Sequence, residues 1–229
     1  MINLTSWRSY SLVISTVGIN LTLLATLLVS TVGNRDVADF KFPQQIHFRE
    51  GKAIAKKSKI NPQLTETATG EVIKARQKYQ YLQDGRSLNL GISYLVGTRG
   101  DVSTYLQTYT SVAEEIIKTK SVKQIPGVGY HALFTDGDRA YLTSCISPRS
   151  PSNITQKQFS QHRYQQDLQL QVGLDWLRGK ASIRDRRSLW ILLSTPVTAS
   201  DSQAAEEILS TAWKDIYQWW LPNFPQLIR

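Results

Sequence analysis

An uncharged and mostly apolar stretch near the amino terminus constrains this chain more than any other feature. Residues 10–32 read YSLVISTVGINLTLLATLLVSTV, and no charged side chain occurs between Arg8 and Arg35. As a helix this stretch would be about 35 Å long, enough to cross a hydrocarbon core of about 30 Å. It therefore predicts a single-pass transmembrane helix, and a cleaved signal peptide is the alternative interpretation.

Small and hydroxylated residues follow one face of the predicted transmembrane helix. Such a face lets a second helix approach closely and offers hydroxyl groups for hydrogen bonds across the contact. In the alternative interpretation these hydroxyl groups bond back to carbonyl groups of their own helix. The residues predicted to pack against another membrane helix are Gly18, Thr22, Thr26 and Ser30.

The rest of the chain is long enough for one domain with its own core. We expect a short tail at 1–9, the anchor at 10–32, a basic juxtamembrane segment at 33–70 and a folded domain at 71–229. The formal charge of +9 points to an anionic neighbour, such as anionic lipid or an acidic polysaccharide. Nucleic acid is not expected as a partner, because no nucleic-acid-binding motif is present.

Turn residues divide the domain into hairpins and helices. Asp84-Gly85 and the turn at 136–138 each lie between runs of alternating polarity, so both predict a β-hairpin. Asp101 is placed to cap a helix whose apolar stripe continues to Ile117. The apolar run at 187–195 is typical of a central strand.

Two capping boxes predict the starts of later helices, at Thr155 with Gln158 and at Ser200 with Gln203. The second of these helices should end at Pro222. The two prolines in 148–153 indicate a loop. Together these signals predict an α+β fold, in which an antiparallel sheet of about five strands is packed by amphipathic helices.

One set of side chains suggests catalysis. Cys145, His131 and Arg149 offer a thiol, an imidazole and a guanidinium, which are the groups that a sortase-like transpeptidase uses. In the alternative interpretation, a lone cysteine in a strand is a small buried hydrophobe. The three histidines are too scattered to predict a metal site, and no cofactor motif is present.

A second set is basic and precedes the strand at 187–195. Guanidinium groups form planar, bidentate contacts with carboxylates, so these arginines suit a carboxylate or a sugar acid. The alternative is an internal ion pair between Asp185 and one arginine on a solvated turn. The candidate binding residues are Arg149, Arg184, Arg186 and Arg187.

Three segments carry a resemblance to a known family: YLVGTRGDVSTYLQTY at 94–109, YLTSCISPRSPSNIT at 141–155 and IRDRRSLWILLSTP at 183–196. With the short apolar amino terminus, the chain resembles the cyanobacterial cyanoexosortase A system-associated proteins. The resemblance implies a single-pass protein of the inner (plasma) membrane whose main domain is extracytoplasmic. Its partner would be an exosortase, a membrane transpeptidase linked to protein sorting and exopolysaccharide production. The family has no established catalytic residues, and no cofactor is implied.

The leading hypothesis is a non-catalytic accessory protein of such a system. One alternative is a periplasmic glycan-binding module that stacks sugars on Tyr79, Tyr81 and Tyr94, although tyrosines on paired strands usually pack. The other alternative is a cysteine transpeptidase that uses Cys145 and His131. Solvent access separates the hypotheses, because a buried Cys145 or buried tyrosines would remove the groups that each alternative needs.

Overall fold

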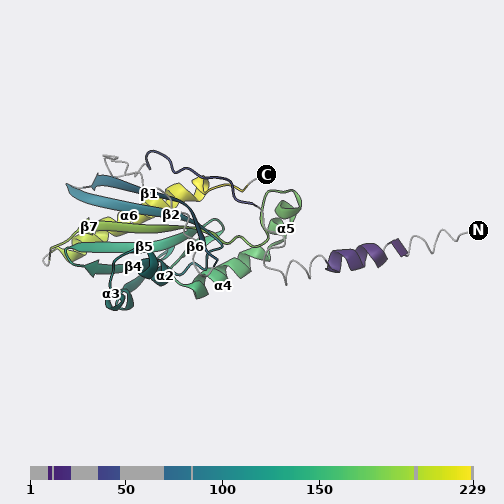
Figure 1. The fold of residues 1–229 in the computed structure, drawn as a ribbon, viewed down its shortest axis with the longest axis horizontal. Coiled ribbons are helices and arrows are strands. Elements are labelled where there is room, and N and C mark those ends of the chain that lie inside the picture. Colours follow the sequence, from purple (N-terminus) through teal and green to yellow (C-terminus); the bar gives the residue numbers. More distant parts are fainter. Residues whose placement is uncertain are drawn as a thin grey trace, which may run out of the picture.

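The computed structural model describes residues 10–21 except Leu12, 36–46, 70–198 except Asp84, and 201–227 (Figure 1). The strands are β1 Val72–Gln83, β2 Arg86–Val96, β3 Ser121–Ile125, β4 Gly129–Asp136, β5 Arg139–Ser147, β6 Ser150–Asn153 and β7 Arg187–Pro196. The helices of the domain are α2 Val102–Tyr109, α3 Glu114–Lys118, α4 Gln156–Asp167, α5 Leu170–Leu177 and α6 Ser202–Asn223.

The strands form one mixed sheet in an α+β arrangement. Their order is β1-β2-β7-β5-β6-β4-β3, and β5 also pairs with β4. The long ladders are antiparallel, whereas β4 and β6 meet in parallel where Gly129 faces Ser152. β7 lies between β2 and β5, so its backbone groups are paired on both sides.

The predicted sheet of about five antiparallel strands is therefore wrong in its number of strands and in its parallel pairing. The strands that sequence reasoning missed are β3 and β6. β3 is exposed along most of its length and shows no apolar alternation. β6 has only four residues and contains Pro151, so its sequence is that of a loop.

The predicted transmembrane helix is also contradicted. Residues 10–11 and 13–21 are helical, and residues 22–35 lie outside the described part of the chain. Within the part of the chain that the structure describes, no helix is both long and apolar enough to cross a membrane. Of the small residues on the predicted packing face, Gly18 lies in this helix, while Thr22, Thr26 and Ser30 lie outside the described residues.

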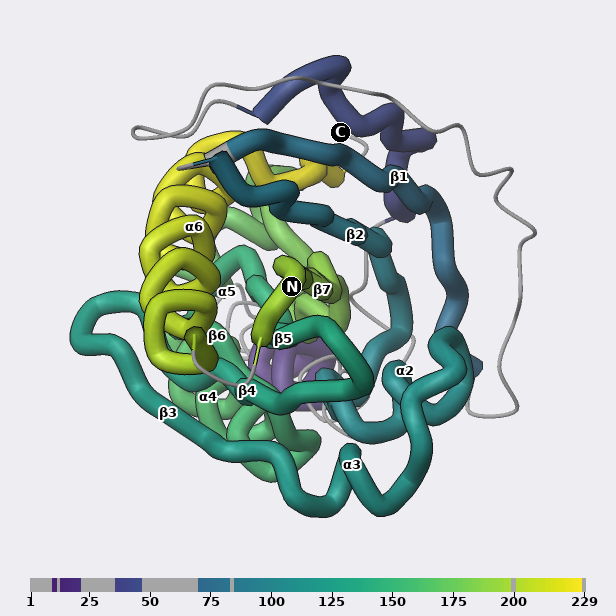
Figure 2. Tube along the Cα trace, turned by 90° about the vertical axis from the view of Figure 1, so that its left-hand side faces the viewer, coloured from purple at the N-terminus to yellow at the C-terminus, as the bar shows by residue number. Residues whose placement is uncertain are grey.

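Helix α6 covers one face of the sheet because its apolar residues recur on one side. Ala205, Leu209, Trp213, Ile216 and Trp220 are buried against the strands. The strands contribute alternate residues to this core, such as those at 88, 90, 92 and 94 of β2 and at 189, 191 and 193 of β7. Figure 2 shows α6 on the left of the strands, with α2 and α3 at the lower right.

The opposite face is covered only in part. Val102, Tyr105 and Leu106 of α2 pack there with Cys145 and Trp190 in a second core. Asp101 caps α2 as predicted, since its carboxylate accepts from the amides of Ser103 and Thr104. The helix ends at Tyr109 instead of continuing to Ile117, because Thr110 takes an extended backbone conformation, and the rest of the apolar stripe forms the separate helix α3.

Both predicted hairpins are confirmed. In the first, Gln83 faces Arg86 across a loop that contains Gly85, and Asp84 lies outside the described residues. In the second, Asp136 faces Arg139. These short connections hold β1 against β2 and β4 against β5, and they bring the polar ends of these strands to one side of the domain.

The helix signals have mixed outcomes. The capping box of Thr155 and Gln158 is present at the start of α4. The second box is not observed, because α6 begins at Ser202 with Asp201 at its N-cap position, and Ser200 lies outside the described residues. α6 also runs one residue beyond Pro222.

Part of the predicted juxtamembrane segment packs on the domain. Phe42 and Ile46 are buried, and Phe42 makes an edge-to-face contact with Trp220 at a centroid distance of 5.7 Å. The Tyr79 hydroxyl donates to the carbonyl of Pro43 at 2.7 Å. The basic run at 49–59 lies outside the described residues.

Replacing Gly129 by alanine should destabilise the fold more than replacing Gly137. Both glycines have positive φ, but an added Cβ at 129 would lie 2.5 Å from the Ser152 carbonyl oxygen, whereas one at 137 meets nothing within 4 Å. In urea unfolding we expect losses above about 2 kcal/mol for Gly129→Ala and of about 1 kcal/mol for Gly137→Ala. Equal losses would show that the contact between β4 and β6 is not tight.

Candidate anion-binding site

Cys145 and His131, the candidate catalytic pair, lie on opposite faces of the sheet. Cys145 of β5 is buried in the core beneath α2. His131 of β4 lies on the α6 side, where the charged groups that act on it are Lys123 and Glu206. Because the backbone of the sheet separates thiol from imidazole, His131 is not placed to accept the thiol proton.

The Cys145 thiol is also in the wrong surroundings for a nucleophile. It is fully buried, and burial raises its pKa well above the ordinary value, with smaller contributions from Asp101 and Glu71. A reactive thiol needs a positive neighbour and access to solvent. The environment fits the alternative interpretation of a small buried hydrophobe.

The three tyrosines considered for sugar stacking are buried. Tyr79, Tyr81 and Tyr94 face α6 and have at most 2% of their surface exposed. Burial raises the pKa of Tyr81 to about 12. Their rings are part of the core and do not form a platform for a ligand.

Several arginine side chains line a cavity of about 360 Å³ at the end of the β2–β7 pair where Val96 faces Arg187. We call this cavity the arginine cleft. Three segments distant in sequence form it: the turn after β2, residues 156–163 of α4 and the turn before β7. No carboxylate lies in this lining. The lining residues are Thr98, Arg99, Gln156, Phe159, Ser160, Arg163, Arg184 and Arg186.

Backbone and side-chain hydrogen bonds hold these three segments together. The Thr98 amide donates to the carbonyl of Arg186 at 3.0 Å, which continues the β2–β7 pairing into the cleft. The Asn153 side chain donates to the carbonyl of Gly100 at 2.8 Å, close to the start of α4. The capping box then sets where α4 begins and so places Arg163 on the cleft side.

The positive charges of the arginines in the cleft repel one another, and nearby carboxylates balance this repulsion only in part. Burial lowers the pKa of Arg186, and the charges of Arg163 and Arg99 lower it further. The opposing charge is that of Glu71, which raises the pKa of Arg186, accepts a hydrogen bond from the Arg99 amide and lies outside the lining. Arg163 pairs with Asp167 at 3.1 Å, outside the lining. An anion in the cleft would relieve this repulsion.

Two of the four arginines predicted from the sequence are used inside the fold. Arg187 is buried and donates twice to Asp185, at 2.7 and 2.6 Å, and once to the carbonyl of Pro225. Arg149 donates to the carbonyl of Ser182 at 2.7 Å and pairs with Asp167 at 3.3 Å. The predicted alternative of an ion pair with Asp185 is confirmed for Arg187, but the pair is buried and not on a solvated turn, whereas Arg184 and Arg186 line the cleft.

Sequence reasoning missed Arg99 and Arg163. Arg99 follows β2 by three residues, and β2 pairs with β7 so that Val96 faces Arg187. This pairing places Arg99 beside Arg186, but the sequence alone does not show which strands pair. The only local signal was the capping box, which fixes the helical phase of Arg163.

No group of three or more metal-ligating side chains is placed to hold a metal ion in the described part of the chain. In the comparisons with known proteins, no family model, no curated protein and no solved structure matches this chain. The chemistry of the described side chains therefore carries the functional argument.

Arg186 and Arg187 are neighbours in sequence but have different roles, so replacing each of them should change the stability of the domain by a different amount. Arg187→Gln leaves Asp185 buried without its cation, so we expect a loss of about 3–5 kcal/mol. Arg186→Gln should change stability by no more than about 0.5 kcal/mol. Urea denaturation of both variants tests this, and a stable Arg187→Gln protein would contradict the structural role.

Acid should destabilise the domain through His131. Burial lowers its pKa from 6.5 to about 4, so the folded state disfavours the charged ring. This contribution to stability is present above about pH 6.5 and is lost as the pH falls toward 4, up to about 3 kcal/mol. His131→Leu should flatten the curve of unfolding free energy against pH over this range. An unchanged curve would show that another group controls acid sensitivity.

Proposed function

We propose that this protein is a non-catalytic recognition subunit that binds a carboxylate of its partner in the arginine cleft. The observation that carries this proposal is the pair Arg99 and Arg186, which line one cavity with Arg163 and Arg184, while Glu71, the carboxylate that acts on both, lies outside the lining. Assembling like charges is unfavourable unless an anion balances them. A protein that holds such a cluster together with its own hydrogen bonds is organised to receive that anion.

A carboxylate suits the cleft better than a bulky apolar ligand. Guanidinium groups present pairs of parallel N–H donors that match the two oxygens of a carboxylate. Ser160 and Gln156 add neutral hydrogen-bonding groups at the rim. Since Arg186 is half-buried, its contacts would be screened less by salt than those of a fully exposed side chain.

The resemblance of the sequence to exosortase-associated proteins supplies the biological setting of this proposal. In that setting the partner is an exosortase, and the domain works outside the cytoplasm beside protein sorting and exopolysaccharide production. The net positive charge supports contact with anionic lipid or acidic polysaccharide in the same place. Neither cysteine chemistry nor sugar stacking on Tyr79, Tyr81 and Tyr94 has an observation in its favour.

A double variant, Arg99→Gln with Arg186→Gln, should lose co-purification with the exosortase of the same cells. The two guanidinium groups supply part of the positive charge of the cleft, so binding should fall most at low salt, where exposed charges are least screened. The measurement is the amount of exosortase retained on the tagged protein across a salt series.

The matched control removes the same charge elsewhere, by Lys74→Gln with Lys214→Gln, two exposed lysines on β1 and α6. This control should retain the partner as the wild type does. If both double variants lose the partner equally, overall charge and not the cleft is responsible. If neither loses it, the proposed role of the cleft is wrong.

A further inference from the structure

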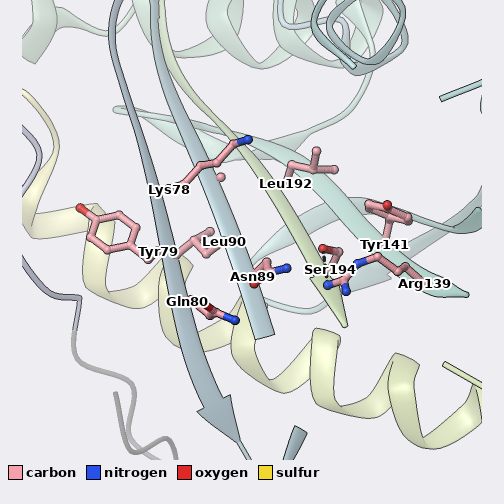
Figure 3. A pocket seen from close by; sticks show the side chains of 10 residues that line it. Lys78, Tyr79, Gln80, Asn89, Leu90, Arg139, Tyr141, Leu192 and Ser194 are labelled. Atoms are coloured by element: carbon pink, nitrogen blue, oxygen red, sulfur yellow. Dashed lines mark hydrogen bonds between the residues drawn. The ribbon is translucent and has the colours of Figure 1, made fainter. Parts of the chain in front are cut away.

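The sheet face opposite α6 carries an open groove beyond the part that α2 covers. Two cavities, of about 410 and 480 Å³, lie side by side on β1, β2, β7 and β5. They are continuous because both are lined by Lys78, Gly91, Tyr141 and Leu192. We call the combined cavity the sheet-face groove, and Figure 3 shows the part farther from α2.

The floor of the groove is flat and partly aromatic. Gly91 has no side chain to fill it, and an added Cβ there would be in ordinary contact with the Leu192 carbonyl oxygen, at 3.7 Å. The Tyr141 ring stacks on Phe134 with centroids 5.0 Å apart and planes 5° from parallel, which holds the ring in place. Aromatic and aliphatic surfaces of this kind pack against the C–H faces of sugar rings.

The rim of the groove is polar and mostly cationic. Figure 3 shows the side chains of Lys78, Gln80, Asn89 and Arg139 around the groove, whereas Tyr79 points away toward α6. Arg139 donates to the Ser194 hydroxyl at 3.0 Å, which fixes the guanidinium at the edge. Arg76 adds a further cation at the α2 end, and Asp136 is the acidic residue of the lining.

Two buried polar atoms at the α2 end have no hydrogen-bond partner among the described residues. These are Nη2 of Arg76 and the hydroxyl oxygen of Tyr109. The Arg76 guanidinium lies 4.5 Å from the centre of the Tyr109 ring, and its Nε donates to the Ser93 hydroxyl at 3.2 Å. Both atoms have almost no exposure to solvent, so a ligand in the groove would contact the exposed parts of these side chains and not these atoms.

The position of the groove argues against a peptide as its occupant. An added peptide strand needs a free sheet edge, whereas β2 and β7 under the groove are already paired on both sides. An amphipathic helix needs an apolar groove, whereas Lys78, Asn89 and Arg139 surround this one. A chain of hydroxyl-rich rings with carboxylates fits both the flat floor and the cationic rim.

We propose that the sheet-face groove is a binding site for an acidic oligosaccharide, a sugar chain that carries carboxylates. The rings lie over Gly91 and Tyr141, the amides of Gln80 and Asn89 contact hydroxyl groups, and Lys78 and Arg139 face the carboxylates. This site shares no lining residue with the arginine cleft, so it stands independently of the function proposed above.

The test uses the full chain and a fluorescently end-labelled oligogalacturonate, with binding followed by fluorescence anisotropy. Gly91→Leu fills the floor, and Lys78→Gln removes an exposed cation of the rim. Each should weaken binding about tenfold or more, which corresponds to at least ~1.4 kcal/mol. The Gly91 amide resonance should shift when the sugar is added to the wild type. If Gly91→Leu does not fold, Lys78→Gln and this resonance decide the outcome.

The controls separate this site from charge alone and from the cleft. A neutral malto-oligosaccharide and an oligoglutamate of matched charge should both bind at least about tenfold more weakly. The cleft variant, Arg99→Gln with Arg186→Gln, should bind oligogalacturonate as the wild type does. Equal binding of oligoglutamate overturns the preference for sugar. Loss of binding in the cleft variant, or no loss in both groove variants, overturns the site.

Discussion

The alternation of side chains along β7 is the constraint on which the rest of the domain depends. β7 is paired on both sides, so successive side chains must point to opposite faces. Leu189, Ile191 and Leu193 enter the core under α6, whereas Trp190 and Leu192 reach the other face. The same alternation places Arg187, the first residue of β7, inward, whereas Arg186, the residue before the strand, lines the cleft.

This division gives the two faces of the sheet different tasks. The α6 face is a continuous core, closed further by residues 36–46, and it carries stability. The other face holds α2 in its middle, with the arginine cleft beyond one end of the β2–β7 pair and the sheet-face groove toward the other end. The two basic surfaces share no lining residue, so each can bind an anionic ligand without the other.

Local signals were sufficient wherever a few neighbouring residues decide the backbone. The hairpin turns, the Asp101 cap and the capping box of Thr155 and Gln158 are of this kind, because each depends on hydrogen bonds within a few residues. β3 and β6 were missed because they are short and have no alternating apolar pattern, so only the hydrogen bonds of their backbone identify them as strands. The apolar run at 10–32 predicted a transmembrane helix, whereas no helix among the described residues is long and apolar enough to cross a membrane.

The sequence alone decides that the domain has amphipathic helices, turn-bounded hairpins and a run of arginines before a central strand. Tertiary structure decides which of those arginines is exposed to a partner. Arg187 pairs with Asp185 and bonds to the segment after α6, Arg149 pairs with Asp167, and Arg186 lies instead beside Arg99 from the turn after β2. The physical reason is that an ion pair depends on distance in space, and distance between remote segments is set by strand order.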